Sequence, residues 1–249
     1  MARTPLTWLI TGCSSGFGLA LIKLAEKQGH TIIATSHKPQ KTPDLLPLDV
    51  NDLNSGDLIM DLEKANTLID ILSIYSPIDT VFFRPYRLIR RNSGIIVNIS
   101  SGARLEGRES IGVYIATKAI IDRINKVLVK EMAPFSICVL IVTLGSFNIN
   151  IGLTVRLASK PMLSDYDDII FKVIATSVIE GFPADRDHVK VAKVKYKVVT
   201  GIGVGEGKES ERMLPLGRDM AKRVDDVVGG WQRTMEVFGD VCNNVYLEK

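Results

Sequence analysis

Short runs rich in β-branched and aromatic residues alternate with helical patterns along most of the chain. This alternation is typical of βαβ units and a mostly parallel sheet. The run 136–142 is almost wholly apolar, which suits a strand covered on both faces. We therefore expect an α/β fold with a doubly wound parallel sheet and helices on both faces, in three α/β/α layers. The expected strands are 6–10, 31–34, 45–48, 80–83, 95–99 and 136–142.

Helices are predicted where apolar residues recur every three to four positions, at 19–28, 57–72 and 113–132, the last ended by Pro134. In the C-terminal third, Val and Lys nearly alternate over 189–199. That period favours an exposed strand, but Ala192 breaks it, and we expect a helix. A short strand at 213–216 and a helix over 219–238, interrupted at Gly229-Gly230, complete the prediction.

The 249 residues suffice for one core, so we expect a single domain over 1–249. The net charge is +3, and only Lys190, Lys193, Lys195 and Lys197 form a dense basic group, which argues against a nucleic-acid partner. Three distant cysteines and three scattered histidines predict neither disulfides nor a metal site. The start lacks a signal-peptide pattern and the apolar run 137–142 is too short to span a membrane, so a cytoplasmic protein is expected.

A glycine-rich segment, TGCSSGFG at 11–18, lies between a predicted strand and a predicted helix. Glycines allow a sharp turn and a close backbone approach, and a helix N-terminus offers N–H groups and a positive dipole end to a pyrophosphate. The spacing Gly-x3-Gly-x-Gly differs from the common Gly-x-Gly-x2-Gly fingerprint. A simple strand-to-helix connection is the alternative interpretation.

Two further signals follow. Tyr114 and Lys118 are four residues apart on a predicted helix, so the ammonium can lie near the phenol and favour the phenolate. Ser101 directly follows the strand 95–99, at the sheet edge where α/β proteins bind ligands, thirteen positions before Tyr114. Each signal alone also fits an ordinary surface pair or a serine cap.

Together and in this order, these motifs resemble the classical short-chain dehydrogenases/reductases, whose fold is Rossmann-like. Leu48-Asp49-Val50, Asn98 to Ser101 and, weakly, the segment Leu214-Pro215-Leu216-Gly217 extend the resemblance over nearly the whole chain. The texture around the glycine-rich turn is similar to that of fungal members, many of which act in secondary metabolism.

The resemblance implies hydride transfer between NAD(P) and a carbonyl or alcohol, with Ser101, Tyr114 and Lys118 as the catalytic residues. Tyr114 would protonate the carbonyl oxygen, Ser101 would hold it, and Lys118 would assist Tyr114 and bind the nicotinamide ribose. A homodimer or homotetramer is also implied. The cofactor would contact Gly12, Ser14, Ser15, Gly16, Phe17, Gly18, His37, Asp49, Tyr114, Lys118 and Phe147.

Residues 35–38, Thr-Ser-His-Lys, offer hydroxyl and basic groups after the second strand, where NAD-binding relatives carry a carboxylate. We therefore expect NADP rather than NAD, with His37 at a position where relatives often have Arg. Residues 150–183, which cover the substrate in this family, contain many apolar side chains, so a small hydrophobic carbonyl compound is expected.

The chain departs from the family pattern after its fourth strand. The motif Asn-Asn-Ala-Gly is absent, Val81 lies nearest to the family's helical Asn, and only residues 84–94 connect the predicted strands 80–83 and 95–99. The Pro-Gly and Thr expected after the sixth strand are replaced within 144–149. The alternative is a nucleotide-binding relative without useful catalysis, structural or regulatory, or the product of a shortened gene. Gly201 to Lys208 fails the phosphate-loop pattern at 202 and 209 and is expected to be a flexible loop.

Overall fold

A computed structural model describes residues 5–10, 12–13, 15–34, 94–107, 109, 111–147 and 187–245. The predicted strands 45–48 and 80–83 and the predicted helix 57–72 lie outside these residues, as does the expected substrate-covering segment 150–183.

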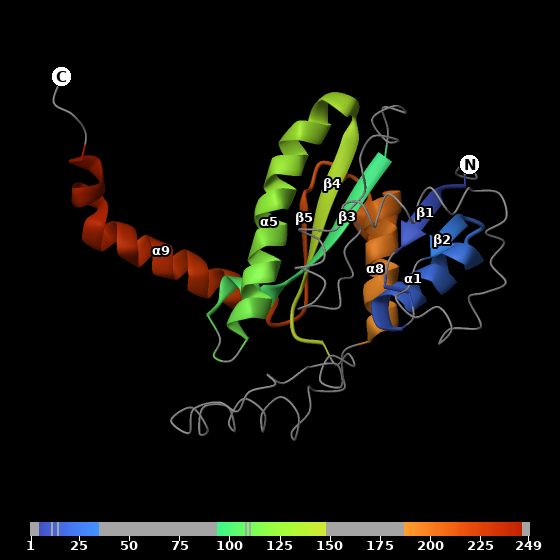
Figure 1. The fold of residues 1–249 in the computed structure, drawn as a ribbon, viewed down its shortest axis with the longest axis horizontal. Coiled ribbons are helices and arrows are strands. Elements are labelled where there is room, and N and C mark those ends of the chain that lie inside the picture. The colour runs from blue at the N-terminus through green and yellow to red at the C-terminus, as the bar shows by residue number, and fades with distance from the viewer. Residues whose placement is uncertain are drawn as a thin grey trace.

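All described strands run parallel, in two groups (Figure 1). Strand β1 (Thr7–Ile10) pairs with β2 (Thr31–Ala34), with Trp8 opposite Ile32. Strand β4 (Ile137–Leu144) lies between β3 (Gly94–Ser101) and β5 (Met213–Leu216). The sequence predicted each of these five strands to within three residues at either end.

Four helices and three short 3-10 turns accompany the strands. Helix α1 begins three residues earlier than predicted, because the glycine-rich turn itself forms its first turn. Helix α8 confirms the helical interpretation of the Val/Lys segment: Asp187 accepts hydrogen bonds from the N–H groups of Val189 and Lys190, and Gly201 ends the helix with φ +60°. The helices are α1 (Gly16–Lys27), α5 (Gly112–Met132), α8 (His188–Thr200) and α9 (Met220–Asn243), and the 3-10 turns are η3 (Gly102–Leu105), η4 (Ala133–Phe135) and η7 (Gly203–Gly205).

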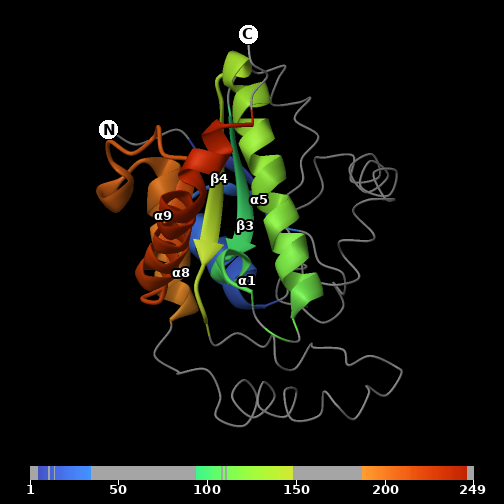
Figure 2. The same cartoon turned by 90° about the vertical axis from the view of Figure 1, so that its left-hand side faces the viewer.

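Alternate side chains of β4 face different helices, which explains its nearly continuous apolar sequence. Ile137 and Val139 pack with Ile96 of β3 against the Met132 end of α5. Leu140, Val142 and Leu144 face the other side and form a core with α1 and α8. Figure 2 shows β3 and β4 between α5 and these other helices, which gives the three expected layers.

Helices α1 and α8 pack side by side and join the two groups of strands. At one end of α8, Tyr196 stacks on Trp8 of β1, with ring centroids 5.8 Å apart, and its hydroxyl lies 2.8 Å from Nε2 of His30. Nδ1 of His30 accepts the backbone N–H of Leu6 at 3.0 Å, so the neutral ring donates from Nε2 to the tyrosine.

Helix α9 begins against η3 and then leaves the rest of the described structure (Figure 1). Met220 and Arg223 are buried at this root, and a side chain at Gly102 would overlap Met220. The helix continues unbroken through Gly229-Gly230, so the predicted interruption is wrong. No helix in the described part of the chain is both long and apolar enough to cross a membrane.

Candidate functional site

The glycine-rich turn lies at the C-terminal end of β1 and leads directly into α1. Gly12 and Gly16 have φ values of +68° and +56°, a backbone conformation that favours glycine. A Cβ at Gly18 would overlap the carbonyl oxygen of Gly12, so the turn and the helix touch backbone to backbone. Ser15 precedes the helix without a side-chain capping bond. The first turn of α1 thus presents backbone N–H groups and a positive dipole end at an exposed position, a suitable arrangement for an anion.

The loop after β4 reaches this turn through two aromatic rings. The ring of Phe147 meets that of Phe17 edge to face, with centroids 5.5 Å apart. On α8, Nζ of the buried Lys195 lies 5.1 Å from the centroid of the Phe17 ring. The structure therefore brings together Phe17 and Phe147, which lie 130 positions apart in the sequence.

Ser101 ends β3 at the same edge of its sheet at which β4 ends, since the two strands are parallel and Ser101 pairs with Leu144. Its Oγ accepts the backbone N–H of Ala103 at 3.2 Å and so caps η3. An accepting hydroxyl keeps its own proton, which Ser101 can donate to another oxygen.

Tyr114 and Lys118 lie one turn apart at the N-terminal end of α5. Nζ of Lys118 is 5.7 Å from the centroid of the Tyr114 ring, which confirms the predicted proximity of the two side chains. Lys118 is only 4% exposed, and its ammonium donates to the carbonyl oxygen of Ile99 at 3.4 Å. The lysine therefore connects the phenol on α5 to the strand that ends in Ser101.

Two buried polar contacts hold α5 against β3 and η3. Asn98 of β3 donates to Asn125 of α5 at 2.7 Å, and Arg104 of η3 forms an ion pair with Asp122 of α5 at 2.7 Å. Burial raises the pKa of the Asp122 carboxyl, although the charge of Arg104 opposes this shift. Both contacts fix the orientation of the helix that bears Tyr114 relative to the strand that bears Ser101.

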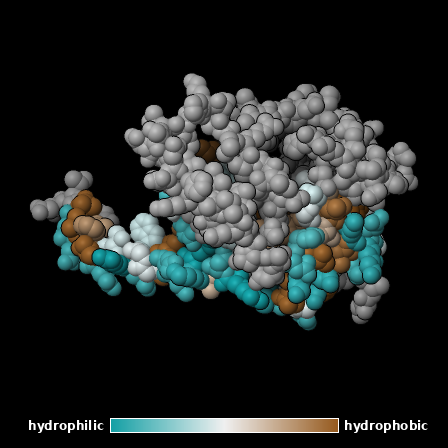
Figure 3. Space-filling model, turned by 90° about the horizontal axis from the view of Figure 1, so that it is seen from below, coloured by the Kyte–Doolittle hydropathy of each residue, from teal (hydrophilic) through white to brown (hydrophobic). Residues whose placement is uncertain are grey.

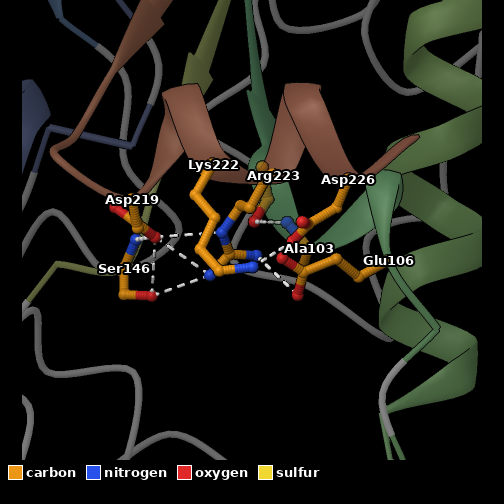
Figure 4. Close-up of polar contacts among 8 residues, drawn as sticks. Ala103, Glu106, Ser146, Asp219, Lys222, Arg223 and Asp226 are labelled. Atoms are coloured by element: carbon orange, nitrogen blue, oxygen red, sulfur yellow. Dashed lines mark hydrogen bonds and ion pairs between the residues drawn. The ribbon is translucent and has the colours of Figure 1, made fainter. Parts of the chain in front are cut away.

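A third polar cluster joins the loops after β3 and β4 to α9 (Figure 4). Asp219 accepts the backbone N–H and the hydroxyl of Ser146 at 3.0 and 3.1 Å. Arg223, only 5% exposed on its side chain, pairs with Asp219 at 2.9 Å and with Glu106 at 3.1 Å. Burial opposes ionisation of Asp219, but these bonds from Ser146 and Arg223 outweigh it and lower its pKa.

Sequence reasoning missed this cluster. The signal closest to it was the segment Leu214 to Gly217, which immediately precedes Asp219. A side chain at Gly145 or Gly217 would overlap the Asp219 carboxylate, so these glycines allow the close approach.

The predicted site residues fall into two groups around one end of the strands. Gly12, Ser15, Gly16, Phe17 and Gly18 form the first group, together with Phe147. Ser101, Tyr114 and Lys118 form the second. Ser14, His37 and Asp49 lie outside the described residues, within which no cluster of His, Cys, Asp and Glu could hold a metal ion.

Comparison with known proteins accounts for this arrangement. Residues 60–158 match the family model for short chain dehydrogenases. Oxidoreductase claN of Passalora fulva is 30% identical over 177 residues, which span 56% of this chain and 81% of that protein. The chain belongs to the short-chain dehydrogenase family. A 3-ketodihydrosphingosine reductase of Bacteroides thetaiotaomicron is also 30% identical, over 58% of this chain and 65% of that protein.

Solved short-chain dehydrogenases share the fold. One from Streptomyces avermitilis superposes with a TM-score of 0.72 at 21% identity and covers 98% of this chain and 100% of its own. Two others were solved in complex with nicotinamide cofactors. The Burkholderia cenocepacia protein holds NADP (TM-score 0.53, 14% identity, 95% and 98% covered), and the Burkholderia phymatum protein holds NAD (0.58, 14%, 100% and 98%). As a short-chain dehydrogenase, this chain is an oxidoreductase of a family that uses nicotinamide cofactors on small carbonyl or alcohol compounds.

Proposed function

We propose that this short-chain dehydrogenase uses NADPH to reduce a carbonyl group of a small hydrophobic molecule, or NADP to oxidise the corresponding alcohol, in secondary metabolism. The observation that carries the proposal is the placement of the Lys118 ammonium 5.7 Å from the Tyr114 ring and 3.4 Å from the carbonyl oxygen of Ile99, two residues before Ser101. Similarity to a fungal oxidoreductase supports the assignment to secondary metabolism.

The residues present fit a dinucleotide. The left-handed glycines at 12 and 16 and the close contact between Gly18 and Gly12 leave backbone at the helix N-terminus, where Gly12, Ser14, Ser15, Gly16, Phe17 and Gly18 would hold the pyrophosphate. Asp49 would lie beside the adenine, and Phe147 beside the nicotinamide. His37 and its neighbours, without a carboxylate, support NADP over NAD. The bound cofactor supplies the hydride.

Three side chains of this chain act on the carbonyl oxygen of the substrate. Ser101 donates its hydroxyl proton in a hydrogen bond and so fixes the oxygen. Tyr114 transfers its phenolic proton to the same oxygen as negative charge develops there. Lys118, whose ammonium lies beside the phenol, stabilises the phenolate that remains and bonds the nicotinamide ribose. In oxidation, Tyr114 accepts the proton instead.

Cofactor binding is the first test. The purified protein is titrated with NADPH and with NADH while nicotinamide fluorescence and thermal stability are followed. We expect NADPH to bind more tightly than NADH and to raise the melting temperature. Absence of binding of either cofactor up to about 1 mM would leave less than about 4 kcal/mol of affinity and would contradict the proposal.

Turnover is then measured with hydrophobic ketones and aldehydes in the wild type and in two matched variants. Tyr114→Phe should bind NADPH normally but lose turnover at least about 100-fold, because the proton donor is gone. Tyr196→Phe removes a phenolic hydroxyl at the opposite end of the strands and should keep turnover. Binding of NADPH without any turnover in the wild type would favour instead a nucleotide-binding relative without catalysis.

A further inference from the structure

The exposed part of α9 has the residue spacing of a coiled-coil helix. Six residues follow one another at gaps of 4, 3, 4, 3 and 4 positions: Val224, Val228, Trp231, Met235, Phe238 and Cys242. This is the a/d spacing of a heptad repeat, which places the six side chains in one line along the helix. We call this line the α9 seam.

The α9 seam is exposed in the described structure. Val224 is 41% exposed and Trp231 67%, with Val228, Met235 and Phe238 between these values. An open groove runs beside the seam, lined by Val227, Val228, Trp231, Gln232, Met235 and Glu236. Figure 3 shows brown, hydrophobic side chains toward the end of the molecule from which α9 projects. A line of large apolar side chains of this length marks an interaction surface.

The charges beside the seam indicate which partner it suits. The positions that flank it, equivalent to e and g of the heptad, are Asp225, Val227, Gln232, Thr234, Gly239 and Val241. Only one of these six is charged. Flanking charges select a different partner and reject a like one in coiled coils. The α9 seam has no such repulsion against a second copy of itself.

We propose that α9 of one molecule pairs antiparallel with α9 of a second copy of this chain, in a two-helix interface centred on Arg233. Around this centre Val224 faces Cys242, Val228 faces Phe238 and Trp231 faces Met235 of the other copy, because each pair of numbers has the same sum. Asp225 then lies across from Gly239, so the two acidic side chains do not meet.

The antiparallel direction follows from volume and from the fold. A parallel pair would place Trp231 opposite Trp231 and Phe238 opposite Phe238, whereas the antiparallel register alternates large and small side chains. The helix spans about 36 Å at 1.5 Å per residue. Because its root is fixed on η3, antiparallel pairing keeps the two folded bodies at opposite ends of the interface (Figure 1).

Oligomeric state in solution provides the first test. Sedimentation velocity of the full chain between about 1 and 100 µM should show a concentration-dependent dimer. Trp231→Glu and Met235→Glu should each weaken dimerisation at least about 10-fold while far-UV circular dichroism stays unchanged. Val237→Glu is the matched control, since Val237 is 63% exposed on the same helix but lies outside the seam, and it should dimerise like the wild type.

A disulfide tests the register. In a Cys138→Ser background, Val224→Cys should form a cross-linked dimer between Cys242 and the new cysteine on oxidation, while the parent with Cys242 alone should not. Positions 224 and 242 of one helix are about 27 Å apart, so this bridge forms only between copies. Cys13 is buried and does not interfere.

Three results would overturn the proposal. A monomer at every concentration would mean that the α9 seam serves some other helix or none. A dimer insensitive to Trp231→Glu would place the interface elsewhere on the molecule. Efficient oxidation of Cys242 to Cys242 in the parent would show parallel pairing and exclude the antiparallel register.

Discussion

A single carboxylate oxygen, Oδ2 of Asp219, connects the loop after β4 with the root of α9. It accepts two hydrogen bonds from Ser146 and one from Nε of Arg223. Arg223 continues the connection to Glu106, in the loop that follows Ser101. One ionised group thus fixes two loops that border the candidate site, and its ionisation should be visible in stability.

Replacement of Asp219 by Asn should destabilise the protein at pH 7 by about 1–3 kcal/mol, because Arg223 stays buried without its ionic partner. The pKa of Asp219 is lowered in the folded state, so its contribution is present above the ordinary aspartate pKa of about 3.9 and is lost as pH falls through the folded value. Urea unfolding of both proteins between pH 7 and 3 should show a difference that narrows below about pH 4.

The matched control for this experiment is Asp226→Asn on the same helix. Asp226 is 55% exposed and pairs with exposed Lys222, so its removal should leave the unfolding midpoint unchanged. A constant difference between wild type and Asp219→Asn across the whole pH range would show that the charge of Asp219 does not act as described.

The contact between Gly18 and Gly12 predicts a strong effect of a single methyl group. In Gly18→Ala the new Cβ meets the carbonyl oxygen of Gly12, so the turn must move away from the helix N-terminus. We expect NADPH binding to weaken at least about 10-fold, measured by the fluorescence titration. Gly229→Ala adds the same methyl group where nothing lies within 4 Å and should bind NADPH like the wild type.

Individual residues were predictable where a motif is local in sequence. The proximity of Tyr114 and Lys118 follows from one helical turn, and the glycine-rich turn follows from its place between a strand and a helix. The contact of Phe17 with Phe147 and the ion pairs of Arg223 join distant segments. No spacing in the sequence encodes such contacts, because they depend on how the elements pack.

At the scale of elements, period and composition predicted type better than continuity. The Val/Lys segment formed α8 despite its strand-like alternation, because Val191, Ala192 and Lys195 become one buried face when wound as a helix. The glycine pair in α9 suggested a break. It does not produce one, since the cost of a glycine in a helix is about 1 kcal/mol and flanking residues supply the helix propensity.

The same glycines predict how α9 can be stabilised. Gly229→Ala and Gly230→Ala each remove backbone freedom from the unfolded chain and meet no atom within 4 Å. Each should stabilise the helix by about 0.5–1 kcal/mol. The measurement is amide hydrogen exchange along α9, which should slow in the double variant. Unchanged exchange would mean that this part of the helix opens for reasons other than backbone propensity.

At the scale of the whole molecule, the two groups of strands share one core through α1 and α8. Phe17 of α1 and Val191 of α8 pack in the same buried cluster as Val142 of β4. On the other flank, Tyr196 of α8 contacts Trp8 and His30. The candidate site draws its glycine-rich turn from one group and Ser101 with Tyr114 from the other, so the site depends on this joint.

Unfolding should therefore be cooperative across the joint. The chain has two tryptophans, Trp8 and Trp231, so in a Trp231→Phe background fluorescence reports the β1–β2 pair alone while far-UV circular dichroism reports all elements. The two urea transitions should coincide. Phe17→Ala should lower both midpoints together by an amount worth about 3–5 kcal/mol, because its ring is 3% exposed at the centre of the joint. A Trp8 transition that precedes the loss of helix would instead show that β1 and β2 unfold separately from β3, β4 and β5.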